Sequence, residues 1–120
     1  MEMRGNNVDL LSEGIEQFNV ARFFEAHEVW EDLWRATEGE LKLFYQGLIQ
    51  AAVGLVHAQR GNAVGARSQI AKSLAKLERY PGAYAGLDNA ALITCLKRSL
   101  DAISDGRTAA ALESVRIVPL

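Results

Sequence analysis

The sequence predicts an all-α fold: a compact bundle of about six helices arranged as antiparallel hairpins. Apolar residues recur at helical spacing along almost the whole chain, and no segment shows the sustained alternation that is typical of a strand. Only 2 Pro are present, against many Ala, so little in the chain interrupts a helix. A length of 120 residues suits one domain, spanning 1–120, which is long enough to bury a core.

Charge and composition exclude several classes of protein. The chain has 13 Lys and Arg against 15 Asp and Glu, a net charge of -2, so it lacks the basic excess of a nucleic-acid-binding module. The same balance argues against a polybasic membrane-surface segment. An apolar content of 49% excludes low-complexity disorder. We therefore expect neither nucleic acid nor membrane among the partners.

Turn and cap residues divide the chain into its elements. Helices are predicted over 8–18, 21–37, 41–60, 63–79, 89–104 and 108–114. Asn6 or Asn7 caps the first helix, Gly39 ends the second, and Asp88 caps the fifth. The dipeptide Gly61-Asn62 is a strong turn signal after the third helix. The apolar tail 115–120 should pack on the bundle, because a free end of this kind would be an exposed patch.

Small residues form a weak internal repeat. Gly14 precedes Ala26 by twelve residues, just as Gly54 precedes Ala66, forty residues further along. A small residue stands five positions before each of these alanines, and Gly106 and Ala111 repeat that shorter spacing. Small residues at such offsets allow two antiparallel helices to approach closely. This pattern permits two arrangements: three stacked hairpins with tetratricopeptide-like spacing, or a simple bundle.

Compartment follows from two further features. Cys95 is the only cysteine, so an intramolecular disulfide and a cysteine-based metal cluster are both excluded, and its apolar neighbours suggest a buried hydrophobe. The N-terminus lacks the apolar core of a signal peptide, so a cytoplasmic location is expected. The longest charge-free stretch, 43–59, is shorter than a membrane span and predicts a central buried helix.

The second predicted helix carries polar residues next to aromatic ones. Its solvent face holds four charged residues, namely Glu25, Glu28, Asp32 and Arg35. His27 lies on the opposite stripe with Trp34 and is predicted to be buried, while Glu31 lies at the edge of that stripe. Glu28 stands nearer the charged side, so its orientation is left open. Apolar residues of this helix and of the three long helices that follow it are predicted to form the core: Phe23, Phe24, Trp30, Leu48, Ile49, Leu55, Ile70, Leu74, Leu77, Leu92, Leu96 and Leu100.

The third predicted helix is apolar nearly all round, yet it contains a polar stripe of Gln46, Gln50 and His57. Beside that stripe runs a row of small residues, Gly47, Ala51, Gly54 and Ala58, where another helix can approach. Because an unsatisfied buried polar group costs about 1–3 kcal/mol, the stripe is expected to face His27 and Glu31. The prediction is therefore a polar pocket between the second and third helices, with Trp34 at its rim and Tyr45 as a further candidate.

Three kinds of chemistry remain open for this pocket. His27, Glu28 or Glu31, and His57 are a reasonable ligand set for a divalent metal, although nothing in the sequence requires a cofactor. A His beside a Glu could also act as a general base. Alternatively, the polar groups form a purely structural hydrogen-bond network that sets helix register. The zinc-protease motif HExxH fails, because Glu31 stands where its second His belongs.

Several blocks of the chain, in order, resemble a known family. His27-Glu28 followed by Trp34 matches HExxxxxW, the signature of a small all-helical family of unknown function. Phe24-Glu25-Ala26 before it, Tyr45-Gln46-Gly47-Leu48-Ile49-Gln50 after it, and later blocks up to Asp88 are also similar to that family. The resemblance implies a compact helical bundle without an agreed activity. It also implies that His27, Glu28 and Trp34, accompanied by Gln46 and Gln50, are the signature positions.

Three functions are consistent with these observations. The first is a non-enzymatic binding module that presents a groove to a protein partner or to a second copy of itself. The second is a metal-dependent hydrolase or metal-binding protein that uses His27, Glu28 or Glu31, and His57. The third is a purely structural role for the polar network. The loop from Tyr80 to Asp88 is a candidate lid or partner surface, or a mere connection.

Overall fold

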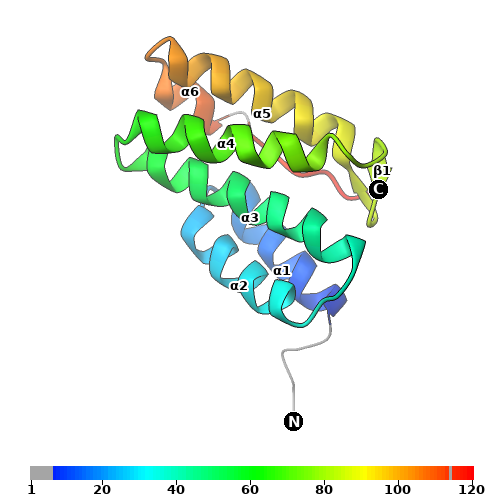
Figure 1. Cartoon of the computed structure of the whole chain (residues 1–120). Helices are drawn as coiled ribbons and strands as arrows, with labels where there is room; N and C mark the ends of the chain where they lie inside the picture. The colour runs from blue at the N-terminus through cyan, green and yellow to red at the C-terminus, as the bar shows by residue number, and fades with distance from the viewer. Residues whose placement is uncertain (1–6, 114) are drawn as a thin grey trace.

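The computed structural model describes residues 7–113 and 115–120, and it confirms the all-α fold (Figure 1). The elements in chain order are α1 (Asn7–Asn19), α2 (Phe23–Arg35), α3 (Glu40–Gln59), α4 (Ala63–Leu77), β1 (Ala83–Tyr84), β2 (Leu87–Asp88), α5 (Asn89–Ser104) and α6 (Thr108–Glu113). Each helix lies within about two residues of its predicted bounds, the usual uncertainty of helix ends.

The cap predicted at Asp88 is confirmed, and the end of α2 predicted at Gly39 is wrong. Asn62, predicted as a turn residue, is also a cap. The side chains of Asn62 and Asp88 accept hydrogen bonds from the backbone N–H groups three residues later, and so cap α4 and α5. Asn7 is the first helical residue of α1 and therefore not its cap, while Asn6 lies outside the described residues. Gly39 does not end α2. That helix stops at Arg35, and Gly39, with φ 78°, immediately precedes α3.

The helices form three antiparallel hairpins, α1–α2, α3–α4 and α5–α6, with the α3–α4 pair in the middle of the stack (Figure 1). All three turns have one geometry. A residue with positive φ stands two positions after the last residue of each first helix, and the backbone N–H of the residue after it bonds the carbonyl five residues back. The positive-φ residues are Ala21, Gly61 and Gly106, and the bonds run from Arg22 to Gln17, Asn62 to His57, and Arg107 to Ala102. The repeat in the sequence is thus a repeat of one helical hairpin.

Small residues lie where the helices of a hairpin cross. Five residues after each positive-φ position stands a buried alanine: Ala26, Ala66 or Ala111. A Cβ on Gly54 would lie 3.2 Å from the carbonyl oxygen of Ala66, and the Ser99 hydroxyl donates to the carbonyl oxygen of Ala111 at 3.2 Å. Gly47 and Gly54, two residues of the predicted row of small residues on α3, therefore lie where α4 packs.

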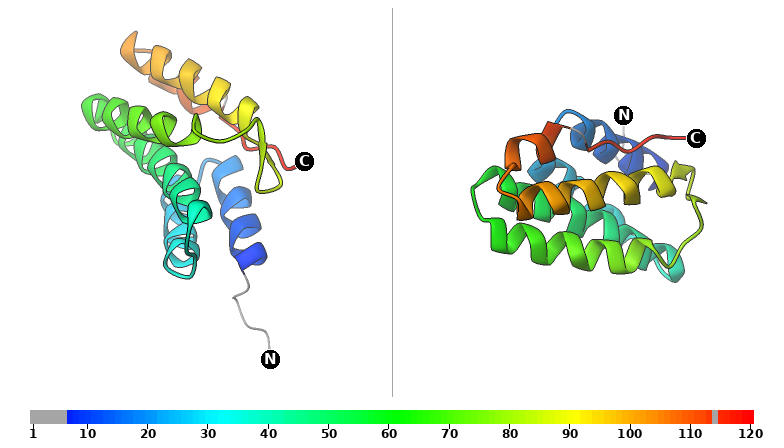
Figure 2. Two further views of the ribbon diagram at one scale, coloured as in Figure 1. Left: turned by 45° about the vertical axis from the view of Figure 1, so that its right-hand side comes forward. Right: turned by 90° about the horizontal axis from the view of Figure 1, so that it is seen from above.

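The C-terminal segment ties the first hairpin to the last part of the chain. The Asn19 side chain bonds both backbone groups of Ile117, at 2.9 and 2.8 Å, while Val118 and Leu120 bond the backbone of Asp88 and Gly86. Figure 2 shows this segment running back along the molecule toward the β1–β2 hairpin. Val115 and Ile117 are buried, so the prediction that the tail packs is confirmed.

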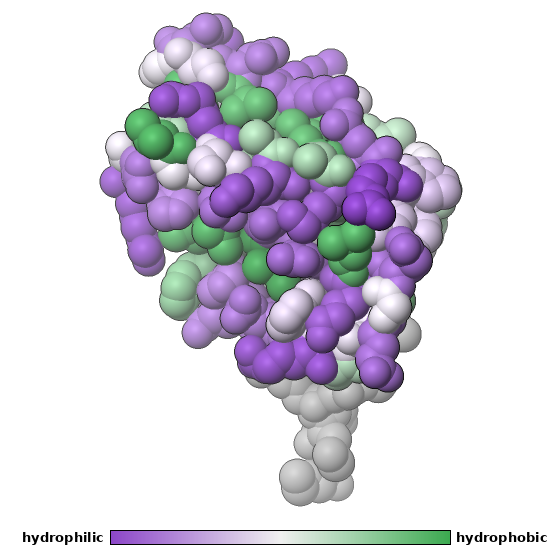
Figure 3. Space-filling view, viewed as in Figure 1, coloured by the Kyte–Doolittle hydropathy of each residue, from purple (hydrophilic) through white to green (hydrophobic). Residues whose placement is uncertain are grey.

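The buried core contains most of the predicted residues, with three differences. Phe24 is predicted to be core but is 42% exposed, and the Arg60 guanidinium lies 5.7 Å from the centroid of its ring. Cys95 and Leu100 are half-buried on α5 rather than fully buried. Apolar residues on the face of Figure 3 occur in small separate areas. Among the described residues, no helix is long and apolar enough to cross a membrane.

Candidate functional site

The second helix places its polar side chains around a buried aromatic face. Phe23, Ala26 and Trp30 are buried against the neighbouring helices, while Glu28 and Asp32 are exposed, as the helical pattern predicts. The turn before α2 is held by the Gln59 side chain, which donates to the carbonyl oxygen of Ala21 at 2.9 Å. This bond fixes the start of α2 against the end of α3.

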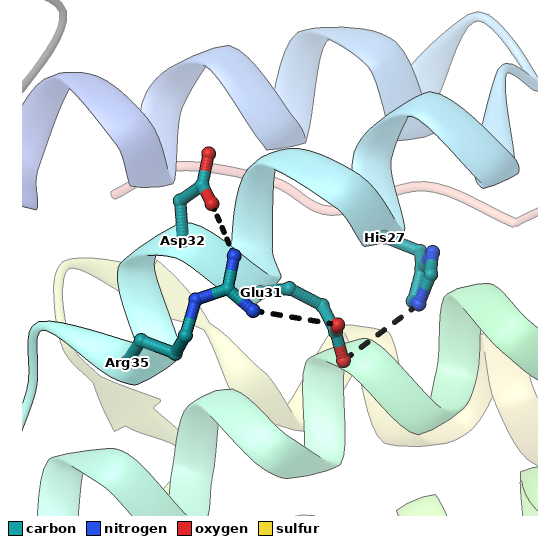
Figure 4. A network of polar contacts seen from close by, with 4 residues as sticks. All are labelled: His27, Glu31, Asp32 and Arg35. Carbon is teal, nitrogen blue, oxygen red and sulfur yellow. Dashed lines mark hydrogen bonds and ion pairs between the residues drawn. The ribbon is translucent and has the colours of Figure 1, made fainter.

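Four side chains of α2 form a chain of ionic contacts (Figure 4). Nε2 of His27 lies 3.7 Å from Oε2 of Glu31, and Nη1 of Arg35 lies 3.8 Å from the other oxygen of that carboxylate. Arg35 also contacts Asp32 through Nη2 and Oδ1. In Figure 4, His27 and Glu31 point toward the side of α2 along which α3 runs, and Asp32 points to the opposite side.

His27 is less buried than predicted. Its side chain is 25% exposed, and that of Glu31 is 42% exposed. The contact between them joins two side chains one helical turn apart on the same helix, and it lies beyond hydrogen-bond distance. His27 therefore makes a surface ion pair when protonated and does not belong to a buried network.

We expect His27→Gln to change the free energy of unfolding by less than about 0.5 kcal/mol at pH 7, because a partly exposed i,i+4 pair contributes little. Urea unfolding followed by circular dichroism measures this change. A loss of 1–3 kcal/mol, the cost of breaking a buried hydrogen bond, would instead support a structural network around His27.

Trp34 and Gln50 each leave one polar atom buried without a partner among the described residues. These atoms are Nε1 of Trp34 and Oε1 of Gln50, and both side chains are half-buried. Nζ of Lys42 lies 4.1 Å from the centroid of the Trp34 ring, which brings the start of α3 to the end of α2. Gln46 is half-buried on α3 between Lys42 and Gln50.

His57 contacts a different part of the molecule. Its Nδ1 lies 3.2 Å from Nδ2 of Asn62, and a Cβ added to Gly65 would meet its ring. The side chain thus contacts the α3–α4 turn and the first turn of α4. In the part of the chain that the structure describes, no group of three or more His, Cys, Asp or Glu side chains could hold a metal ion. The candidate ligands His27, Glu28, Glu31 and His57 therefore form no such group.

A hollow of about 490 Å³ adjoins the polar side of α2. It is lined by Glu13 and Gln17 from α1 and by Glu25, His27, Glu28, Val29, Glu31, Asp32 and Arg35 from α2. The contribution of α1 was missed from the sequence. The sequence did contain one signal for it, because Glu13 and Gln17 are four residues apart and therefore lie on one face of their helix. Tyr45, by contrast, does not line this hollow.

Comparison with known proteins identifies the family. Residues 11–79, which run from α1 to the end of α4, match the domain of unknown function DUF309. An uncharacterised protein of Aquifex aeolicus (strain VF5) is 30% identical over 81 residues, 67% of this chain and 24% of that protein. The uncharacterised protein YpuF of Bacillus subtilis (strain 168) is 32% identical over 108 residues, 87% of this chain and 60% of YpuF.

The two relatives are longer proteins, of which this chain spans about a quarter and three-fifths. The family match covers the first two hairpins except the start of α1, and it contains every residue of the candidate site. The third hairpin lies outside it. With more than half of its length matched, the chain belongs to the DUF309 family, whose domain has no assigned function.

Proposed function

We propose that this protein is a non-enzymatic binding module whose α1–α2 hairpin binds a basic segment of a partner protein. The observation that supports this proposal is the composition of the 490 Å³ hollow, which is lined by five carboxylates and one Arg. The carboxylates are Glu13, Glu25, Glu28, Glu31 and Asp32. A surplus of one sign of charge around a concave surface attracts ligands of the opposite sign and raises their association rate.

The contacts within the hollow leave part of this negative charge available to a ligand. Arg35 offsets the charge of Glu31 and Asp32, and Arg22 lies 3.8 Å from Glu25. Glu28 is exposed and has no ion pair or hydrogen bond with any other described residue. In this proposal the side chains of His27, Glu28 and Glu31 contact the ligand. Trp34, Gln46 and Gln50 lie where α2 meets α3. His57 does not take part in binding.

The hydrolase alternative has less support. It needs a bound metal, and the described residues contain no group of three or more His, Cys, Asp or Glu side chains that could hold one. A His and a Glu one turn apart on a partly exposed helix face can hold a proton or a cation, but they provide no donors that would stabilise an oxyanion.

The proposal is tested with two labelled peptides of equal length, one of alternating Lys and Ser and one of alternating Glu and Ser. We expect fluorescence anisotropy to show saturable binding of the basic peptide alone. The affinity should fall as the salt concentration rises from 50 to 300 mM, because the contacts are screened.

The double variant Glu28→Gln, Glu31→Gln should weaken this binding by about three- to fivefold, given about 0.3–0.5 kcal/mol for each exposed ion pair. Glu113→Gln removes one exposed carboxylate on α6, away from the hollow, and serves as the control. Equal binding of the two peptides, or equal losses in the double variant and the control, would contradict the proposal.

A further inference from the structure

A second hollow, of about 580 Å³, lies where α1, the start of α3, the β1–β2 hairpin and the C-terminal segment meet. Apolar side chains from all four line it, including Leu11 and Ile15 of α1, Leu41 of α3, Leu87 of β2 and Pro119 of the C-terminal segment. Its volume falls in the range of small-molecule sites, roughly 300–1,000 Å³. We refer to it as the apolar groove. The residues that line it are distinct from those of the acidic hollow on α2.

Three polar side chains also line the apolar groove: Ser12, Glu16 and Tyr45. Ser12 and Glu16 are exposed on α1, and the Glu16 carboxylate has no ion pair or hydrogen bond with any other described residue. Burial, and to a lesser extent the neighbouring Tyr84, raises the pKa of the Tyr45 hydroxyl. Tyr45 therefore stays neutral at physiological pH, and among the described residues that line the groove Glu16 has the only charged side chain.

The wall formed by the hairpin is held in place by hydrogen bonds. The turn of the hairpin consists of Ala85 and Gly86, both with positive φ, and both line the groove. The Leu120 backbone N–H donates to the Gly86 carbonyl at 2.8 Å, and the C-terminal segment is itself anchored by Asn19. Positive φ is a sparsely populated conformation for residues other than glycine, and it persists only where the surrounding structure holds it. The groove is thus a preformed concavity.

We propose that the apolar groove binds a small, mainly apolar molecule that carries a single positively charged amine. The apolar part displaces water from Leu11, Ile15 and Leu41, and the ammonium group lies against the Glu16 carboxylate. A carboxylate at the same end of the ligand would be repelled by Glu16. A carboxylate without a partner among the described residues, beside an apolar hollow of small-molecule size, selects this class of ligand.

The probes for a test are decylamine, 1-decanol and decanoate, each used below its aggregation concentration and titrated into the methyl-labelled protein. We expect NMR shifts at the methyl groups of Leu11, Ile15 and Leu41, with decylamine binding about tenfold more tightly than 1-decanol and decanoate binding more weakly than either. Octylamine should bind at least fivefold more weakly than decylamine, because each buried methylene contributes up to about fourfold.

Two variants localise the binding. Glu16→Gln changes an exposed side chain without altering its shape, and should reduce decylamine binding to the level of 1-decanol while leaving 1-decanol unaffected. Ser12→Trp places a large ring from an exposed helical position over the groove, and should abolish binding of all three probes. Circular dichroism and thermal melting confirm that both variants are folded.

Three results would overturn the proposal. The first is a lack of saturable shifts with any of the probes, and the second is equal affinity for decylamine and decanoate. The third is binding that Ser12→Trp leaves unchanged in a folded protein. Peptide binding at the acidic hollow is measured separately, so the failure of either proposal leaves the other standing.

Discussion

Replacing Gly14 with Ala should lower the free energy of unfolding by about 1–3 kcal/mol, although Ala is the better helix former by about 1 kcal/mol. The reason is the contact between α1 and α2. A Cβ at position 14 would overlap with Nε1 and its ring neighbours in Trp30, which is fully buried. The Trp30 N–H donates to the Leu11 carbonyl at 3.3 Å, and its ring lies 5.7 Å from that of Phe18. The indole therefore cannot move aside without losing these contacts.

Urea unfolding monitored by tryptophan fluorescence and by far-UV circular dichroism measures the effect of Gly14→Ala. The matched control is Ser12→Ala, at an exposed position on the same helix, which should change stability by no more than about 0.5 kcal/mol. If both variants behave alike, the close approach of α1 to Trp30 does not determine the packing of the first hairpin.

Asn89→Ala should cost about 2–3 kcal/mol, because it removes the donor that closes the loop between α4 and α5. Asn89 is fully buried, and its Nδ2 lies 3.0, 3.5 and 3.2 Å from the carbonyl oxygens of Leu77, Tyr80 and Pro81. Without the amide these carbonyls lose their side-chain donor, at about 1–3 kcal/mol for a buried group left unsatisfied. The variant also removes the Asn89 Oδ1 atom, which is buried without a partner in the described structure. Removing this unsatisfied atom offsets part of the loss.

Chemical denaturation measures this loss, and Thr94→Ala is the control on the same helix. The Thr94 hydroxyl is exposed and bonds only the carbonyl of Ala90, one turn earlier, so its removal should be nearly neutral. Asn89→Asp supplies a second comparison. It retains the size of the side chain but removes the donor, and should destabilise the protein at least as much as Asn89→Ala. A stable Asn89→Asp would show that the amide donor is dispensable.

Helix periodicity and turn chemistry were sufficient to predict the order and bounds of the helices. Asp88 caps α5 as predicted, and Asn62, which was predicted only as part of a turn, caps α4. An Asn or Asp side chain competes for backbone N–H groups three residues later in any context. Gly39 was misassigned because a positive-φ residue serves equally well after one helix or before the next. The choice between them depends on where α2 loses contact with the core, which is a tertiary property.

The candidate site was predicted less well, and for one physical reason. A helical pattern places residues on a face of their own helix, but it does not reveal how far the neighbouring helix covers that face. His27 lies on the predicted side of α2, yet remains partly exposed. His57 shares the stripe of Gln50 but stands at the end of α3, where Asn62 and Gly65 are its neighbours. Burial and partners at such positions depend on the tilt and register of two helices.

By itself, the sequence determined that this protein is an all-α chain of helical hairpins, because apolar spacing, caps and small residues act locally and need no knowledge of neighbours. Its resemblance to a family of unknown function is confirmed by the match over residues 11–79. Only the tertiary structure decided that α1 completes the acidic hollow and that the C-terminal segment walls the apolar groove. These surfaces join residues such as Ile15 and Pro119, whose proximity results from packing across the whole chain rather than from any local pattern.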